Sequence, residues 1–131
     1  MPIEGDRAGW EPDPLNAGCP SRAVVDLIAD RWSILVLTAV DRGAHRNGEL
    51  MRMVQGISQK ALTRTLRDLE RSGLVDRHDH HEVPPRVDYA LTPTGASIIP
   101  LLSSLCEWSI EHMDDVTAAR ARFGRALQAA R

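Results

Sequence analysis

The sequence lacks a long apolar run, a set of closely spaced cysteines and an apolar N-terminal signal. None of its apolar stretches approaches the roughly 20 residues that a membrane-spanning helix needs. Its two cysteines, Cys19 and Cys106, are too far apart to indicate the disulfide framework of a small secreted domain. The first residues are acidic and rich in proline and glycine, unlike a secretory signal. We therefore expect a soluble protein of the reducing cytoplasm, with no membrane partner.

The sequence also has no pattern typical of an enzyme. It contains no arrangement typical of a Ser-His-Asp triad, no phosphate-binding loop and no firmly spaced set of metal ligands. We predict that the protein is not an enzyme and that it has no cofactor. Its 131 residues suffice for one domain with an apolar core.

The charges are unevenly distributed along the chain. The formal net charge of −2 does not by itself indicate a polyanionic partner, but distribution matters more than the total. Residues 1–19 hold four acids and one cation, whereas residues 46–71 hold six cations and three acids. In the sequence, the acid excess thus lies outside the basic segment.

The stretch GISQKALTRTLRDLERSGLVDR, residues 56–77, predicts a helix that carries most of these cations. At about 100° per residue, Leu62, Leu66 and Leu69 share one stripe, which is the face expected to pack on the core. Ser58 is expected to cap the helix. Almost opposite the leucines, within an arc of about 60° that contains no acid, lie four cations. These are Lys60, Arg64, Arg67 and Arg71.

The segments before this helix predict the rest of a helix-turn-helix. Pro20 suits the first turn of one amphipathic helix, and residues 31–40 are apolar on every side, as in a buried central helix. Asn47 is expected to cap a short helix that carries Leu50. The tight turn VQGIS then joins this short helix to the basic helix.

The segments after the basic helix predict a β-wing and a long helix. One strand is expected to start at Leu74 and Val75, and another to span residues 87–91. The polar loop RHDHHEVPP separates them, and its two prolines cannot donate to a ladder. Thr92 is expected to cap a helix from Pro93 to at least Met113. The predicted fold class is mainly α with a small β-wing, a winged helix-turn-helix with N- and C-terminal dimerisation helices.

Composition divides the chain into three expected segments. Residues 1–18 are predicted to form a flexible arm, residues 19–116 the winged helix-turn-helix domain with its dimerisation helices, and residues 117–131 a basic helical tail. The tail either braces a dimer, contacts phosphate or is a solvated terminal helix. It holds four cations and no acid, namely Arg120, Arg122, Arg125 and Arg131.

The long helix predicts self-association. Its apolar residues between 98 and 113 cover an arc of about 200°, about twice what a helix on a single core needs. A domain this small has little else to cover the surplus face, so a second copy is the expected partner, with deeper burial in the monomer as the alternative. The residues expected at the dimer interface are Leu101, Leu102, Leu105, Trp108 and Ile110.

In a winged helix-turn-helix the second helix enters the major groove of DNA, with its N-terminal residues nearest the bases. Gln pairs with adenine, and Arg or Lys pairs with guanine. Arg67 and Arg71, further along the helix, are expected to contact phosphate and to set the register. The candidates for base contacts are Ser58, Gln59, Lys60, Thr63 and Arg64.

Several motifs occur together in a fixed order: CP at 19–20, DRW at 30–32, Gly-Ile-Ser at 56–58, a proline-rich wing and Tyr-x-Leu-Thr-x-x-Gly at 89–95. This set resembles the HxlR-type helix-turn-helix regulators, a branch related to the MarR-type winged-helix factors. The resemblance implies a dimeric bacterial transcription regulator whose terminal helices form the dimer interface. The family usually has Phe where this chain has Asn47.

By this resemblance, Cys19 matches the cysteine with which some relatives sense oxidants or electrophiles. A thiol at a helix start can have a lowered pKa and become reactive, and the alternative is a small packing residue. Regulation by thiol oxidation, an electrophile or a small-molecule effector is therefore expected. Cys106 is expected in the core, with a link to the partner's Cys19 as the alternative.

His78, His80 and His81 cluster in the wing. On a strand the first two share a face, but no fourth ligand is fixed, so we predict no metal site. The simpler interpretation is a wing that meets the minor groove or phosphates, with Arg77 and Arg86 as its steady charges. Protonated histidines there are expected to tighten DNA binding at lower pH.

The sequence therefore predicts a sequence-specific DNA-binding regulator that acts as a homodimer on a near-palindromic operator. The alternative is a winged helix used as a protein–protein interaction module, with its basic helix facing an acidic partner. A gel shift with DNA from upstream of the gene distinguishes the two.

Overall fold

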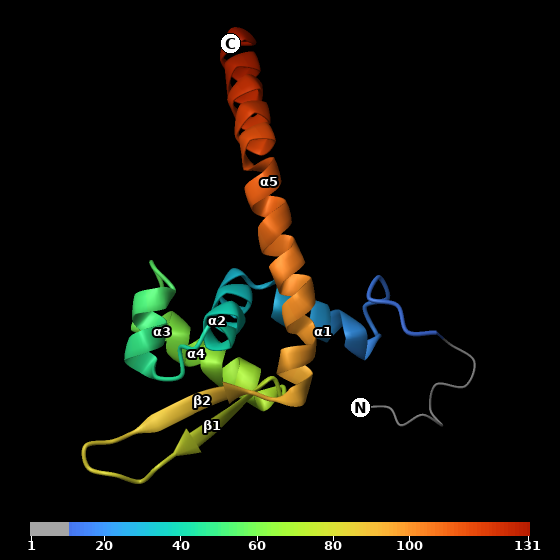
Figure 1. The fold of residues 1–131 in the computed structure, drawn as a ribbon. Coiled ribbons are helices and arrows are strands. Elements are labelled where there is room, and N and C mark those ends of the chain that lie inside the picture. Colours follow the sequence, from blue (N-terminus) through green and yellow to red (C-terminus); the bar gives the residue numbers. More distant parts are fainter. Residues whose placement is uncertain (1–10) are drawn as a thin grey trace. The chain divides into compact units, whose positions relative to one another are not determined.

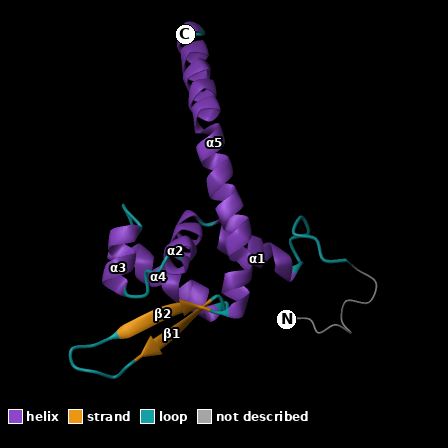
Figure 2. Cartoon of the chain, viewed as in Figure 1, coloured by secondary structure: helices purple, strands orange, loops and turns teal. Residues whose placement is uncertain are grey.

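The computed structural model describes residues 11–131, and its elements follow the predicted order (Figures 1 and 2). Residues 1–10 of the predicted arm lie outside the described residues. The chain forms two compact units, one up to Ser97 and one from Ile98 to Arg131. The elements are α1 (Pro20–Ala29), α2 (Arg31–Asp41), α3 (Asn47–Met53), α4 (Gln59–Arg71), β1 (Val75–Asp79), β2 (Val87–Leu91) and α5 (Pro93–Ala129).

The core of the first unit lies between α2 and α4, which contact each other. Leu62, Leu66 and Leu69 of α4 are buried, as the leucine stripe predicts. The central helix α2 supplies Val36 and Leu37, which are both fully buried. Each buried side chain of this size stabilises the fold by about 1.5–3 kcal/mol. The orientation of α4 is therefore strongly determined, and its polar side must face outward.

The helix starts agree with the sequence for α4 but not for α3. The Ser58 hydroxyl accepts a hydrogen bond from the Ala61 N–H at 3.0 Å, so Ser58 caps α4 as predicted. The prediction that Asn47 caps α3 is wrong, because Asn47 is the first helical residue and Arg46 occupies the cap position. The carboxylate of Glu49 closes this end instead by accepting from the Arg46 N–H at 3.0 Å.

The wing is an antiparallel hairpin of β1 and β2 (Figure 2). Its register pairs Val75 with Leu91 at the base and Asp79 with Val87 toward the tip. The strand predicted at residues 87–91 is confirmed. The first strand starts at Val75 rather than Leu74, and it reaches Asp79, so residues 77–79, which were expected in the loop, pair with β2. The loop is therefore shorter than the stretch RHDHHEVPP.

The motif Tyr-x-Leu-Thr-x-x-Gly joins the wing to the start of α5. The Thr92 hydroxyl donates to the Gly73 carbonyl at 2.6 Å and accepts from the Gly95 N–H at 3.0 Å, which confirms Thr92 as a cap. A Cβ on Gly95 would collide with the Leu74 carbonyl, so only glycine permits this close approach. The motif thus fixes the end of β2 beside the end of α4.

In the second unit, α5 continues as a single helix through residues 117–129, with Pro100 inside it. Its apolar residues are largely exposed in the single chain, with Trp108 54% and Ile110 67% exposed. Leu101 and Leu105 are also exposed, whereas Leu102 is only 2% exposed and is therefore already buried in the single chain. No helix within residues 11–131 combines the length and apolarity needed to cross a bilayer.

Candidate nucleic-acid interface

The turn between α3 and α4 fixes how α4 is presented. Gly56 has a φ of +89°, a left-handed conformation in which glycine carries no Cβ penalty. Ile57 before the cap and Leu62 after it are both buried, which is the arrangement expected of a hydrophobic staple. The turn and the staple together hold the first residues of α4 beside α3.

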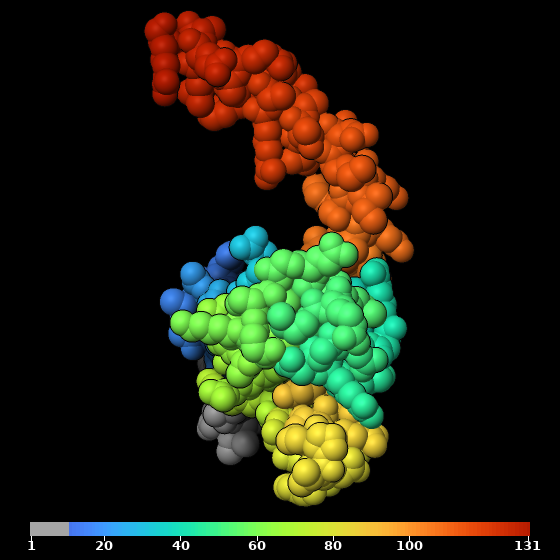
Figure 3. All heavy atoms as spheres, turned by 90° about the vertical axis from the view of Figure 1, so that its left-hand side faces the viewer, coloured from blue at the N-terminus to red at the C-terminus, as the bar shows by residue number. Residues whose placement is uncertain are grey.

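A row of exposed cations runs along the outer side of α4, and we call Lys60, Arg64, Arg67 and Arg71 the basic ridge. Among residues 11–131, only Arg71 of this ridge has an acid partner, with its guanidinium 3.5 Å from the Asp68 carboxylate. That pair is highly exposed and therefore weak. The ridge lines a hollow on the same face together with Gln59 and Thr63. Figure 3 shows the face of the first unit that carries α3 in green and the wing in yellow.

The first turn of α4 is joined to α3 by a pair of side-chain amides. The Asn47 Nδ2 group donates to Gln59 Oε1 at 2.8 Å, and the Gln59 Nε2 group donates back to Asn47 Oδ1 at 2.8 Å. The Gln59 Nε2 group also donates to Thr63 Oγ1 at 3.0 Å. All three residues are exposed. We call the two reciprocally bonded side chains the amide pair.

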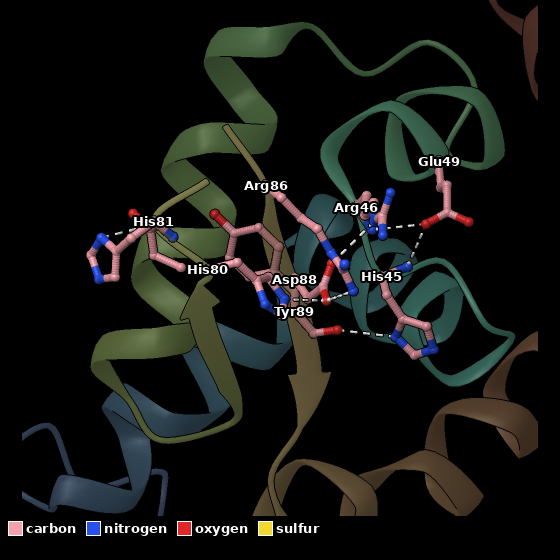
Figure 4. Close-up of polar contacts among 9 residues, drawn as sticks. His45, Arg46, Glu49, His80, His81, Arg86, Asp88 and Tyr89 are labelled. Carbon is pink, nitrogen blue, oxygen red and sulfur yellow. Dashed lines mark hydrogen bonds and ion pairs between the residues drawn. The ribbon is translucent and has the colours of Figure 1, made fainter. Parts of the chain in front are cut away.

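The wing is attached to the start of α3 through Asp88, which lies between three positively charged or ionisable groups (Figure 4). The Asp88 carboxylate is 3.1 Å from Arg46 Nε, 2.7 Å from His80 Nε2 and 3.4 Å from an Arg86 guanidinium nitrogen. The hydrogen bond from His80, then that from Arg46, and the charge of Arg86 lower the pKa of Asp88 to about 2. We call these four residues the wing anchor.

A second connection ties the wing to α3 through the backbone. The Tyr89 N–H donates to the His45 carbonyl at 2.7 Å, and His45 Nδ1 donates to the Tyr89 carbonyl at 3.0 Å (Figure 4). These bonds add to the wing anchor, so β2 is held beside the loop that precedes α3. The wing and the helix-turn-helix therefore form one surface within the first unit.

The charged and ionisable side chains of the wing differ in their partners and in their exposure. Arg86 is engaged by Asp88, and its Nε is buried without a hydrogen-bond partner. Arg77 lies 3.9 Å from the Asp79 carboxylate and is partly exposed. The rings of His78 and His80 contact edge to face, with centroids 4.3 Å apart, as expected for side chains on one face of a strand. Within residues 11–131 no cluster of three His, Cys, Asp or Glu side chains could hold a metal ion.

Cys19 occupies the cap position of α1 and is 4% exposed in the single chain. Its Sγ is 3.0 Å from the Ser21 hydroxyl, and this hydrogen bond lowers the pKa of the Cys19 thiol. A thiol at a helix start with a lowered pKa has the chemistry that oxidation requires. Cys106, on α5, is half-buried, and both cysteines are free thiols.

The sequence does not indicate that Arg46, Asn47 and Asp88 are parts of this surface. Arg46 and Asp88 are 42 positions apart, and no local pattern pairs them. Asp88 stands between Val87 and Tyr89 in the second strand, where a charged residue would be expected to face solvent.

Comparison with known proteins gives a consistent result. A model of HxlR-like helix-turn-helix proteins matches residues 27–117. An uncharacterized HTH-type transcriptional regulator of Methanothermobacter thermautotrophicus is 48% identical over 90 residues, which cover 69% of this chain and 69% of that protein.

Two solved structures extend the similarity to the fold. YtfH from Salmonella typhimurium, described as a transcriptional regulator, is similar with a TM-score of 0.78 and 35% identity, covering 85% of this chain and 99% of that one. The redox regulator HypR in its reduced form is similar with a TM-score of 0.69 and 32% identity, covering 76% of this chain and 98% of that one.

Proposed function

Because this chain belongs to the HxlR-like helix-turn-helix family, and is therefore a transcriptional regulator of helix-turn-helix type, we propose that it binds a near-palindromic operator as a homodimer. Membership of the family confirms the predicted resemblance and the predicted winged helix-turn-helix fold. The observation that carries the proposal is the basic ridge, whose Lys60, Arg64 and Arg67 have no acid partner within residues 11–131. Unpaired cations on one exposed helix face suit the phosphates and base edges of duplex DNA.

The ridge divides into base contacts and phosphate contacts by position along α4. The N-terminal residues of a recognition helix lie deepest in the major groove, so Lys60 and Arg64 take base edges, with guanine as the preferred base. Arg67 and Arg71 lie further from the groove floor and bind phosphates, which sets the register on the duplex. Ser58, Gln59 and Thr63 are the other candidates for base contacts near the start of α4.

The wing supplies the second DNA contact, beside the helix. The wing anchor keeps the hairpin against α3, so Arg77 and the exposed His81 reach the phosphates or minor groove next to the half-site. Arg86 contributes mainly to the attachment, because Asp88 already engages its guanidinium. The position of the wing is thus set by Asp88 rather than by the loop itself.

Dimerisation is supported by the exposed apolar face of α5. Leu101, Leu105, Trp108 and Ile110 stay exposed in the single chain, whereas a second copy would cover them. Leu102 is already buried, so it does not belong to the proposed contact.

The charges of α5 favour an antiparallel pair of these helices. Acids alone precede residue 116, at Glu107, Glu111, Asp114 and Asp115, and cations alone follow it, at Arg120, Arg122, Arg125 and Arg131. An antiparallel crossing near Val116 places each basic end against the partner's acidic stretch, whereas a parallel pair opposes like charges. We further propose that the two half-sites are separated by one helical turn of DNA, roughly 34 Å, or by a whole multiple of that spacing.

We propose that thiol chemistry modulates this binding. Cys19 has a lowered pKa, and the similar protein HypR is a redox regulator with a described reduced form. In the reducing cytoplasm, which we propose as the location, both thiols start reduced. Oxidation or an electrophile at Cys19 would disturb the start of α1 and thereby change the affinity for DNA.

A fluorescence anisotropy titration with DNA from upstream of the gene, against random DNA of equal length, tests the proposed function. Preferential binding of the upstream DNA, lost when diamide is added and regained with a thiol reductant, is expected. Equal binding of both DNAs would contradict sequence-specific recognition. Binding of an acidic protein in place of DNA would favour an interaction module instead.

A further inference from the structure

The amide pair links a residue of the recognition helix to a residue outside it. Asn47 is the first residue of α3, and Gln59 is the first residue of α4. The two side chains exchange hydrogen bonds of 2.8 Å in both directions. Both side chains are exposed, and Gln59 lines the same hollow as the basic ridge. The pair therefore lies at the point where α4 would first meet base edges.

The pair uses most of the hydrogen-bonding capacity of Gln59. A side-chain amide has two N–H donors and one oxygen with two lone pairs. Gln59 donates one N–H to Asn47 and another bond from the same nitrogen to Thr63, and its oxygen accepts once from Asn47. What remains free on Gln59 is a single lone pair of Oε1.

Adenine recognition requires the same hydrogen-bonding groups of Gln59 that the amide pair occupies. A Gln side chain reads adenine by using its oxygen and an N–H together, accepting from N6 and donating to N7. The reciprocal bond with Asn47 occupies that same edge of the amide, which carries the oxygen and the adjacent N–H. While the pair is intact, Gln59 can only accept one hydrogen bond, from the amino group of either adenine or cytosine.

We propose that Asn47 is a positioning residue that sets the base preference of Gln59, a claim that rests on the proposed DNA-binding function. The intact amide pair gives a preference for a base with an amino group in the major groove, with little distinction between adenine and cytosine. Loss of Asn47 releases the adenine-reading edge of Gln59. Removal of Asn47 from α3 therefore increases the preference of Gln59 for adenine over cytosine, at one base position in each half-site.

Selection of binding sites from a randomised DNA library, followed by competition anisotropy on the selected operator, tests this inference. The variants are Asn47→Ala and Asn47→Phe, which both remove the amide, together with Gln59→Ala and the double variant Asn47→Ala/Gln59→Ala. Asn47→Phe removes the amide but keeps a large side chain at this position. Gln55→Ala is the matched control, because Gln55 is an exposed amide in the turn between α3 and α4.

Both Asn47 variants are expected to raise the preference for adenine over cytosine by about fivefold or more at one position per half-site. Gln59→Ala is expected to abolish the amino-base preference there, and the double variant to behave like Gln59→Ala alone. Gln55→Ala should keep the wild-type preference. In NMR spectra, the side-chain amide protons of Gln59 should exchange faster with water in Asn47→Ala, while circular dichroism confirms that the variant is folded.

Two results would overturn the inference and leave the proposed function intact. The first is an unchanged adenine-to-cytosine ratio in both Asn47 variants while Gln59→Ala alters it. The second is an effect of Asn47→Ala that persists in the Gln59→Ala background, because Asn47 would then act by another route. A wild-type protein that selects no DNA sequence would instead overturn the proposed function, and the inference with it.

Discussion

The basic ridge and the wing anchor contain the same kinds of side chain in opposite electrostatic situations. On α4, Lys60, Arg64 and Arg67 have no acid partner within residues 11–131. At the wing, Arg46 and Arg86 both lie within 3.4 Å of the single carboxylate of Asp88. Lys60, Arg64 and Arg67 stay free to bind an anion, whereas Arg46 and Arg86 are used for attachment.

This difference shows that a count of cations does not identify a DNA-binding surface. An Arg side chain is available for DNA binding where the fold places no acid near it, and it serves internal structure where an acid lies close. A partly buried carboxylate with three such neighbours remains ionised well below its usual range, which explains the pKa of about 2 for Asp88. We expect substitutions on the ridge to change DNA binding and substitutions at the anchor to change stability first.

The largest expected effect on DNA binding is that of Arg64→Ala. Affinity for the operator should fall by roughly 5- to 150-fold, because one good base contact is lost, with a smaller fall for random DNA. Anisotropy titrations on both DNAs measure the two losses. Equal losses on operator and random DNA would remove Arg64 from base reading and would make the ridge a uniform phosphate surface.

The next effect is that of Asp88→Asn, which removes the charge on which the wing anchor depends. The melting temperature should fall by roughly 5 °C, and operator affinity should fall less than for Arg64→Ala. The pKa of Asp88 is lowered from 3.8 to about 2, so its stabilising contribution is present above about pH 4 and is lost as the pH falls toward 2. Thermal melts across this range should show a dependence on pH that is weaker in the variant.

Within the ridge, Arg71 is the exception, because it has a partner in Asp68. Arg71→Ala should weaken operator and random DNA alike and reduce the slope of log affinity against log salt by about 0.9. Asp68→Ala should raise the affinity for both DNAs, because it frees the Arg71 guanidinium. Identical salt slopes for wild type and Arg71→Ala would show that this cation makes no phosphate contact.

The smallest expected effect concerns the wing histidines. His78 and His81 are both exposed on the wing, which lies near phosphate in the proposed complex. The double variant His78→Ala/His81→Ala should lower operator affinity by about twofold, because two polar side chains near phosphate are lost. An unchanged affinity in anisotropy titrations would remove both histidines from the DNA contact.

The sequence predicted what depends on local periodicity. The leucine stripe of α4, the Ser58 cap and the strand at residues 87–91 each follow from neighbours a few positions apart, and all appear in the structure. The exposed apolar side of α5 was also predictable, because its arc is wider than one core needs.

The contacts that refine the site were not predictable. Asn47 and Gln59 are 12 positions apart, and they meet only because the turn folds α4 against α3. The bond between Arg46 and Asp88 depends on the hairpin lying beside α3, which no pattern in either segment specifies. Both cases join side chains whose partners are set by tertiary packing. From the sequence alone, such residues can only be predicted to be exposed and polar.

The central claim is that the unpaired cations of α4 bind DNA, whereas Arg46 and Arg86 of the wing anchor serve attachment. Operator binding as a function of salt concentration tests this most directly, with the triple variant Lys60→Ala/Arg64→Ala/Arg67→Ala compared with the double variant Arg46→Ala/Arg86→Ala. The triple variant should lose most of its operator affinity and about 0.9 in slope, for the phosphate contact of Arg67, while the double variant keeps a slope close to that of the wild type. A wild-type slope in the triple variant, with the loss confined to the double variant, would contradict the account.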